Sequence, residues 1–169
     1  MATLSFFATH PDVAERETRS LTIQGHLTLP DDEYAFLEFY CDDPTCDCRR
    51  VTIRVISRKT EGQQTFATIS YGWGSLSHYL KRSGNRALAA QQTGTILDPI
   101  NPQSPHAPAL LEFFNRMLAD TAYEARLRQH YDLVKQTAQS HMAHSQTVRC
   151  ESQARATFHA RPRPRQKRR

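Results

Sequence analysis

The sequence has no long hydrophobic run. Hydrophobic residues make up 38% of the 169-residue chain, and no stretch approaches the roughly 20 apolar residues that a membrane-spanning helix needs. The N-terminus, MATLSFFATHPDVAERE, has no basic region before its short apolar run, so it does not match a secretory signal. We therefore expect a cytoplasmic protein, where clustered cysteines serve metal or redox chemistry more often than they form disulfides.

Glycine is scarce, with six residues, and the motifs of several enzyme classes are missing. The sequence contains no glycine-rich phosphate-binding loop, no H-E-x-x-H helix, no G-x-S-x-G nucleophile turn and no deaminase H-x-E with P-C-x-x-C. No acid–base pair can be identified from the sequence either. Sequence motifs therefore assign no reaction to this protein.

The net charge of +5 is distributed unevenly along the chain. Residues 149–169 contain eight Arg or Lys and one acid, a charge of +7, whereas the rest contains 14 basic and 16 acidic residues, a charge of −2. Because alternating Arg and Pro form neither helix nor sheet, we expect residues 139–169 to be a disordered basic tail. Such a tail can bind the phosphates of RNA or DNA without sequence preference, or can simply keep the protein soluble. The predicted nucleic-acid contacts are Arg161, Arg163, Arg165, Lys167, Arg168 and Arg169.

The body of the chain predicts one α+β domain over residues 20–138, after an N-terminal extension over residues 1–19. Four segments have the alternation or the aromatic and β-branched content of strands, and the turn-like connection before the last one favours antiparallel pairing. These segments are residues 20–29, 33–40, 51–57 and 65–73. Residues 83–95 are expected to be a loop. Helical periodicity after residue 108 predicts a C-terminal helical hairpin that packs on the four-stranded antiparallel sheet.

Three of the four cysteines lie in YCDDPTCDCRR, residues 40–50, between the second and third predicted strands. The Asp-Pro-Thr turn at residues 43–45 can bring Cys41 toward Cys46, and Cys46 and Cys48 share one face of an extended chain. Zinc prefers four tetrahedral ligands, commonly thiolates and imidazoles. We therefore predict one zinc ion per chain, held by Cys41, Cys46 and Cys48.

The fourth ligand of this site is less well defined. His130 lies on the apolar stripe of the second predicted helix, and we take it as the fourth ligand. His78, Cys150, an aspartate or water are alternatives, and a core histidine bonded to a carbonyl is the alternative interpretation of His130. A three-thiolate zinc centre is negatively charged, and Arg49 and Arg50 can offset that charge through salt bridges or N–H donation to sulfur.

The segments YCDDPTCDCRRV, ISYGW, LDPINPQSPHAPALLEFF and LRQHYDLV together resemble a group of small uncharacterised bacterial proteins of unknown function. The shared pattern is YCxDPxCDCRRV, YGW and DPxNPQSxxAPxLL, and it covers residues 33–135 without the basic tail. The resemblance implies that CDCRR, YGW, NPQS and RQHY belong to one site-bearing unit, which favours His130 over Cys150 as the fourth ligand. It implies no reaction and no substrate.

These observations predict a small, non-enzymatic zinc-binding adaptor whose zinc is structural and whose basic tail contacts nucleic acid. One alternative is a metal-dependent hydrolytic enzyme with an open zinc position, in which the general base would be Asp43, Asp47 or His130. A second is a thiol redox switch that pairs Cys41 with Cys46 or Cys48. A third is that the cysteines are ordinary small residues in a loop.

Overall fold

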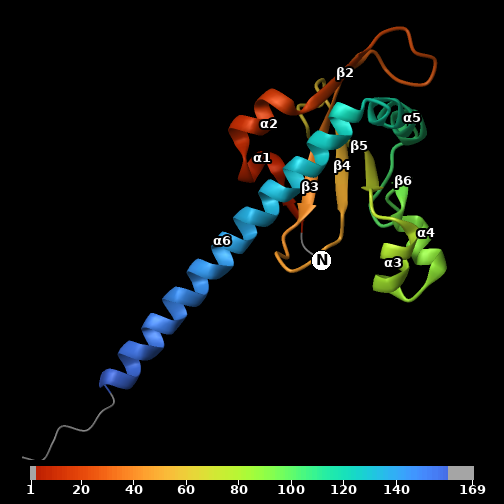
Figure 1. The fold of residues 1–169 in the computed structure, drawn as a ribbon. Coiled ribbons are helices and arrows are strands. Elements are labelled where there is room, and N and C mark those ends of the chain that lie inside the picture. The colour runs from red at the N-terminus through yellow and green to blue at the C-terminus, as the bar shows by residue number, and fades with distance from the viewer. Residues whose placement is uncertain (1–2, 160–169) are drawn as a thin grey trace, which may run out of the picture.

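Six antiparallel strands form one sheet in the computed structural model, which describes the backbone of residues 3–159 and the side chains of residues 3–142. The strands are β1 (Thr3–Ser5), β2 (Arg19–Ile23), β3 (Asp32–Cys41), β4 (Arg50–Ser57), β5 (Thr65–Gly72) and β6 (Gly94–Leu97). The central strand β3 pairs with β4 along one edge and with β1 and β2 along the other. Strands β5 and β6 continue the sheet beyond β4 (Figure 1).

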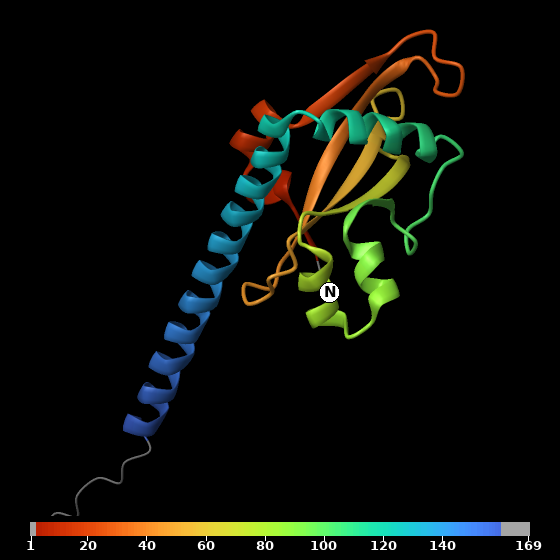
Figure 2. The same cartoon turned by 45° about the vertical axis from the view of Figure 1, so that its right-hand side comes forward.

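Two C-terminal helices cover one face of this sheet, and shorter helices lie around its ends (Figures 1 and 2). The helices are α1 (Phe6–Thr9), α2 (Pro11–Glu17), α3 (Leu76–Ser83), α4 (Arg86–Gln92), α5 (Ala107–Leu118) and α6 (Thr121–His159). The α+β class, the antiparallel sheet and the helices that follow it confirm the coarse prediction of the fold.

The core lies between the sheet and helices α5 and α6. Every second side chain of β3 points into it, as the two-residue period of a half-buried strand requires, and Tyr34, Phe36 and Tyr40 are fully buried. Apolar side chains at helical spacing face them, so removal of apolar surface from water holds the layers together. The buried helix residues are Leu110, Phe114, Tyr123, Leu127 and Val134.

The predicted number of four strands is wrong, because the sheet has six. The two additional strands are the three-residue β1 and the four-residue β6, and both are too short to show an alternating pattern. Residues 83–95, expected to be a loop, contain helix α4 and the start of β6. Asn85 caps α4 by accepting hydrogen bonds from the backbone N–H groups of Ala87 and Leu88.

The two ends of the chain also differ in structure from the expected extensions. Strand β1 and helices α1 and α2 lie within the expected N-terminal extension, residues 1–19, and they place Phe6 and Ala14 in the core. Residues 139–159, expected to be disordered, belong to α6, because no proline or glycine interrupts the helix before Pro162. The six predicted nucleic-acid contacts at 161–169 lie outside the described residues. Within the described part of the chain, no helix is long and apolar enough to span a membrane.

Candidate metal centre

The structure brings the three predicted cysteine ligands together. Cys41 is the last residue of β3, and Cys46 and Cys48 lie in the loop that leads into β4. Their three sulfur atoms all lie within 4.8 Å of one another, and the cysteines are free of disulfides. Tetrahedral zinc with Zn–S bonds of about 2.3 Å places its sulfurs about 3.8 Å apart. The cluster can therefore hold one metal ion after small side-chain adjustments.

The loop is folded by the turn that the Asp-Pro-Thr sequence predicts. The Asp43 carboxylate accepts hydrogen bonds from the backbone N–H of Thr45 at 2.8 Å and from its hydroxyl at 2.7 Å. The backbone N–H of Cys46 donates to the Asp43 carbonyl at 3.2 Å, which closes the turn. Arg49 takes a left-handed backbone conformation, with φ of 48°, just before β4 begins. These local bonds explain how Cys41 and Cys46 meet.

Helix α6 supports the loop from one side. The Tyr131 hydroxyl donates to the Cys46 carbonyl at 3.1 Å, and the Lys135 ammonium group donates to the Asp43 carbonyl. The Tyr131 ring also packs edge-on against Trp73, with ring centroids 5.3 Å apart. Since Tyr131 and Lys135 are buried on α6, these hydrogen bonds fix the loop against the core helix.

Helix α3 supports the loop from another side. A guanidinium nitrogen of Arg82 lies 3.2 Å from the Cys46 sulfur, and Nε2 of His78 lies 3.0 Å from the Asp47 carbonyl. The Tyr79 hydroxyl donates to the Arg49 carbonyl at 2.8 Å. Helix α3 can come this close because residue 74 is glycine, since a Cβ there would lie 2.8 Å from the Tyr79 ring.

The charge compensation differs in part from the prediction. Arg49 forms a two-pronged salt bridge with Asp47, with both N···O distances at 3.0 Å, and does not contact sulfur. The donor to sulfur is Arg82, more than thirty positions along the chain, which no local pattern could reveal. Burial and the neighbouring thiols raise the pKa of Cys48 to about 11. A metal ion that binds here must therefore displace a proton from Cys48.

No fourth side chain joins the three sulfurs among the described His, Cys, Asp and Glu residues. His78 is beside the loop but contacts the Asp47 carbonyl. Cys150 lies in the part of α6 whose side chains are not described. The structure therefore brings together three of the four predicted ligands.

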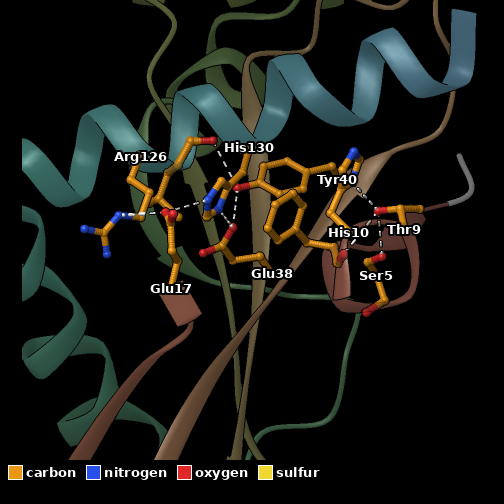
Figure 3. A network of polar contacts seen from close by, with 10 residues as sticks. Ser5, Thr9, His10, Glu17, Glu38, Tyr40, Arg126 and His130 are labelled. Carbon is orange, nitrogen blue, oxygen red and sulfur yellow. Dashed lines mark hydrogen bonds and ion pairs between the residues drawn. The ribbon is translucent and has the colours of Figure 1, made fainter. Parts of the chain in front are cut away.

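His130, the predicted fourth ligand, is placed in a separate polar network inside the core (Figure 3). Its Nδ1 lies 2.7 Å from a Glu38 carboxylate oxygen, and its Nε2 lies 3.2 Å from Glu17. Its ring stacks on Phe6 at 4.0 Å, and the residue is 2% exposed. The Tyr40 hydroxyl donates to the same Glu38 oxygen at 2.7 Å. His130 is thus a core histidine bonded to carboxylates, and the structure does not bring it to the cysteines.

A pocket of about 430 Å³ adjoins the cysteines. Two of the three cysteines, Cys41 and Cys48, line it, together with side chains from the sheet, from helices α3 and α4 and from the segment after β6. Its charged residues are Arg50, Arg54, Arg82 and Asp98. A metal ion at the cysteines would consequently lie at the wall of a cavity large enough for a small molecule.

Comparisons of the chain with protein-family models, with curated proteins and with solved structures found no match. The resemblance of its motifs to a group of bacterial proteins therefore stays a prediction. Function is therefore inferred from the residues of the site.

Proposed function

We propose that this protein binds one zinc ion through Cys41, Cys46 and Cys48. The supporting observation is the approach of three free cysteine sulfurs to within 4.8 Å of one another. Three clustered thiols match the soft sulfur ligands that zinc accepts in structural sites. Calcium and magnesium, which prefer oxygen ligands, fit this donor set poorly.

The zinc has a structural role in this proposal. The cysteine loop meets β3, β4, α3 and α6, so an ion that cross-links Cys41 at the end of β3 to Cys46 and Cys48 would fix the loop against all four elements. Binding energy in such sites becomes folding energy, because the unfolded chain has no preformed site. The fourth ligand is then water or His78, whose ring already lies against the loop.

The metal content of the purified chain tests this proposal directly, by native mass spectrometry before and after acid denaturation. We expect one zinc per chain, lost in Cys46→Ser and kept in the matched variants Cys150→Ser and His130→Gln. A wild-type chain without metal would reject the proposal, and a mass lower by two protons after mild oxidation would indicate a redox pair instead. Loss of zinc in folded His130→Gln would restore that histidine as a ligand.

The pocket beside the cysteines favours a second candidate, a metal-dependent hydrolytic enzyme. Three protein ligands with an open fourth position are the pattern of catalytic zinc, and two of the cysteines line a cavity that a substrate can enter. Metal spectroscopy on the cobalt-substituted protein separates the two roles. A coordination sphere that changes when small anions are added supports the enzyme, and four fixed protein ligands support the structural site.

We also propose that the basic end of the chain contacts RNA or DNA, so that the protein acts as an adaptor. The support is the charge of +7 over residues 149–169 against −2 for the rest of the chain. Deletion of residues 160–169 tests this and leaves α6 intact. We expect weaker retention on RNA and DNA at low salt, and a steeper loss of the wild type as salt rises. Unchanged retention would remove the nucleic-acid role.

A further inference from the structure

The pocket beside the cysteines lies on the face of the sheet opposite to helices α5 and α6. On β4, Val51, Ile53 and Val55 point into the helix-covered core, so the alternate positions 50, 52 and 54 point to the other face. Thr52 pairs with Phe39 on β3 and with Ser70 on β5, and all three line the pocket. The floor of the pocket is therefore a row of neighbouring side chains on three paired strands.

The walls of this pocket carry an excess of positive charge. Three arginines, Arg50, Arg54 and Arg82, face a single carboxylate, that of Asp98. One Asp98 oxygen accepts hydrogen bonds from the backbone N–H of Ile100 and from Asn101, and the other accepts from the Ser70 hydroxyl at 3.1 Å. These bonds hold the Asp98 carboxylate within its own turn, so it is not available to pair with the arginines.

Neutralisation of the cysteines explains only part of this charge. Arg82 contacts the Cys46 sulfur and would offset the negative charge of a three-thiolate metal centre. Arg54 lies four residues beyond Arg50 along β4, a distance of about 13 Å in an extended strand. Its guanidinium group stacks on the Phe39 ring at 4.5 Å, and neither Arg50 nor Arg54 forms a salt bridge within the described part of the chain. Arg50 is half-buried and Arg54 is exposed, so both guanidinium groups are open to an anion that enters the pocket.

We propose that the pocket binds a small organic molecule through an oxyanion group, a phosphate or a carboxylate, that pairs with Arg54, while Arg50 adds positive charge farther along the same floor. The planar guanidinium fork matches the oxygens of both groups, and a charge-assisted pair of this kind is stronger than a neutral hydrogen bond. The hydroxyl of Thr52 lies on the same floor and can add a hydrogen bond. The volume of about 430 Å³ fits a small molecule. This inference goes beyond the zinc proposal and does not require the metal.

The test compares three probes that share one ring and differ in their head group: phenyl phosphate, benzoate and neutral phenol. Isothermal titration calorimetry on the full chain should detect phenyl phosphate or benzoate and should not detect phenol. Whichever anion binds more tightly identifies the head group. Binding of phenol as strong as that of both anions, or no binding of either anion, would overturn the proposal.

A matched pair of variants makes the test specific for the pocket. Arg54→Gln should weaken binding of the preferred anion at least about tenfold, because a charged hydrogen-bond partner is lost. Arg116→Gln is the control, since Arg116 also stacks on a phenylalanine, Phe113, but lies on α5 away from the pocket. Equal weakening by both substitutions would show general charge attraction and overturn the proposal. Zinc content measured on the same samples keeps failure of this site separate from failure of the metal site.

Discussion

Two clusters of ionisable side chains in the described part of the chain, one around His130 and one of three cysteines, differ in how completely the fold satisfies them. Around His130, both ring nitrogens contact carboxylates, Glu38 also accepts from Tyr40, and Arg126 pairs with Glu17 at 3.1 Å. The three cysteines approach one another without forming a disulfide, and they adjoin an open pocket. The first cluster completes its contacts within the chain, whereas the second leaves ligand atoms that an ion can use. Residue type alone does not make a site, because unfilled binding capacity is needed as well.

The largest expected effect comes from Glu38→Ala, which should break the satisfied cluster and leave the other intact. Removal of the carboxylate leaves the buried Nδ1 of His130 without a partner and takes one of two acceptors from the Tyr40 hydroxyl, which keeps only the Leu127 carbonyl. We therefore expect a loss of about 3–5 kcal/mol in the free energy of unfolding. Urea denaturation measures it. The control is Glu33→Ala on the same strand, which loses only exposed contacts with Arg58 and with the Ser20 hydroxyl and should cost far less.

Zinc content provides the second reading of the Glu38→Ala variant. If the clusters are independent, the folded variant keeps one zinc per chain. A folded Glu38→Ala protein that has lost its zinc would show that the two clusters are not independent, because loss of the His130 network would then have changed the metal centre.

The next effect is the response of stability to zinc. At a free zinc concentration a hundred times the dissociation constant, the wild type should gain about 2.7 kcal/mol over the chelated protein, since the ion binds the folded state preferentially. Thermal or chemical denaturation with and without a chelator measures this gain. Cys46→Ser should show no response. An equal gain in that variant would place the ion elsewhere.

A smaller effect, on zinc affinity, is expected from Arg82→Gln, which tests whether the contact of Arg82 with the Cys46 sulfur supports metal binding. Loss of N–H donation to the Cys46 sulfur should weaken zinc binding about tenfold, at the lower end of effects for groups that orient metal ligands. Competition with a chromophoric chelator measures the affinity. Lys81→Gln, the neighbouring cation on α3, is the control. Identical affinities for the two variants would mean that Arg82 has no role in metal binding.

The smallest effect is expected at Glu124 on α6, which forms a partly exposed hydrogen bond with Tyr71 on β5. The Tyr71 hydroxyl donates to Glu124 at 2.6 Å, and this bond, together with that from Arg128, lowers the pKa of Glu124 from 4.5. A lowered pKa in the folded state stabilises the protein above the unfolded pKa, and that stability is lost as the pH falls through the folded pKa.

Tyr71→Phe removes the first of these two donors to Glu124. The variant should therefore be less stable than the wild type by about 1 kcal/mol at pH 7, with a smaller difference near pH 3. Urea midpoints at the two pH values measure it. A difference that is independent of pH would show that Tyr71 acts through packing and not through the carboxylate.

Local patterns were sufficient for the central strands, for the start of the C-terminal helices and for the meeting of the cysteines. Each of these depends on neighbours in sequence: alternation along β3, helical spacing in α5 and α6, and the turn at Asp43. Strands β1 and β6 could not be predicted, because strands of three and four residues at the rim of a sheet are defined by their pairing partners.

The partners of His130 and Cys46 required the tertiary structure. Glu38 contacts His130 from 92 positions away, and Arg82 reaches Cys46 from 36 positions away. One signal was available for the first pair. Glu38 occupies an inward position of β3 between Phe36 and Tyr40, and a carboxylate in a buried row needs a polar partner. No equivalent signal marked Arg82.

Helix α6 also determines the hydrodynamic shape of the molecule. Its 39 residues span about 58 Å, and residues 139–142 are already exposed, so its last turns extend well beyond the body (Figures 1 and 2). A compact chain of this length would have a radius of gyration of about 15 Å. Small-angle scattering should therefore give a larger radius and a skewed distance distribution. The helix acts as a spacer, because the basic end starts farther from the acidic body than the roughly 8 Å over which charges interact in physiological salt.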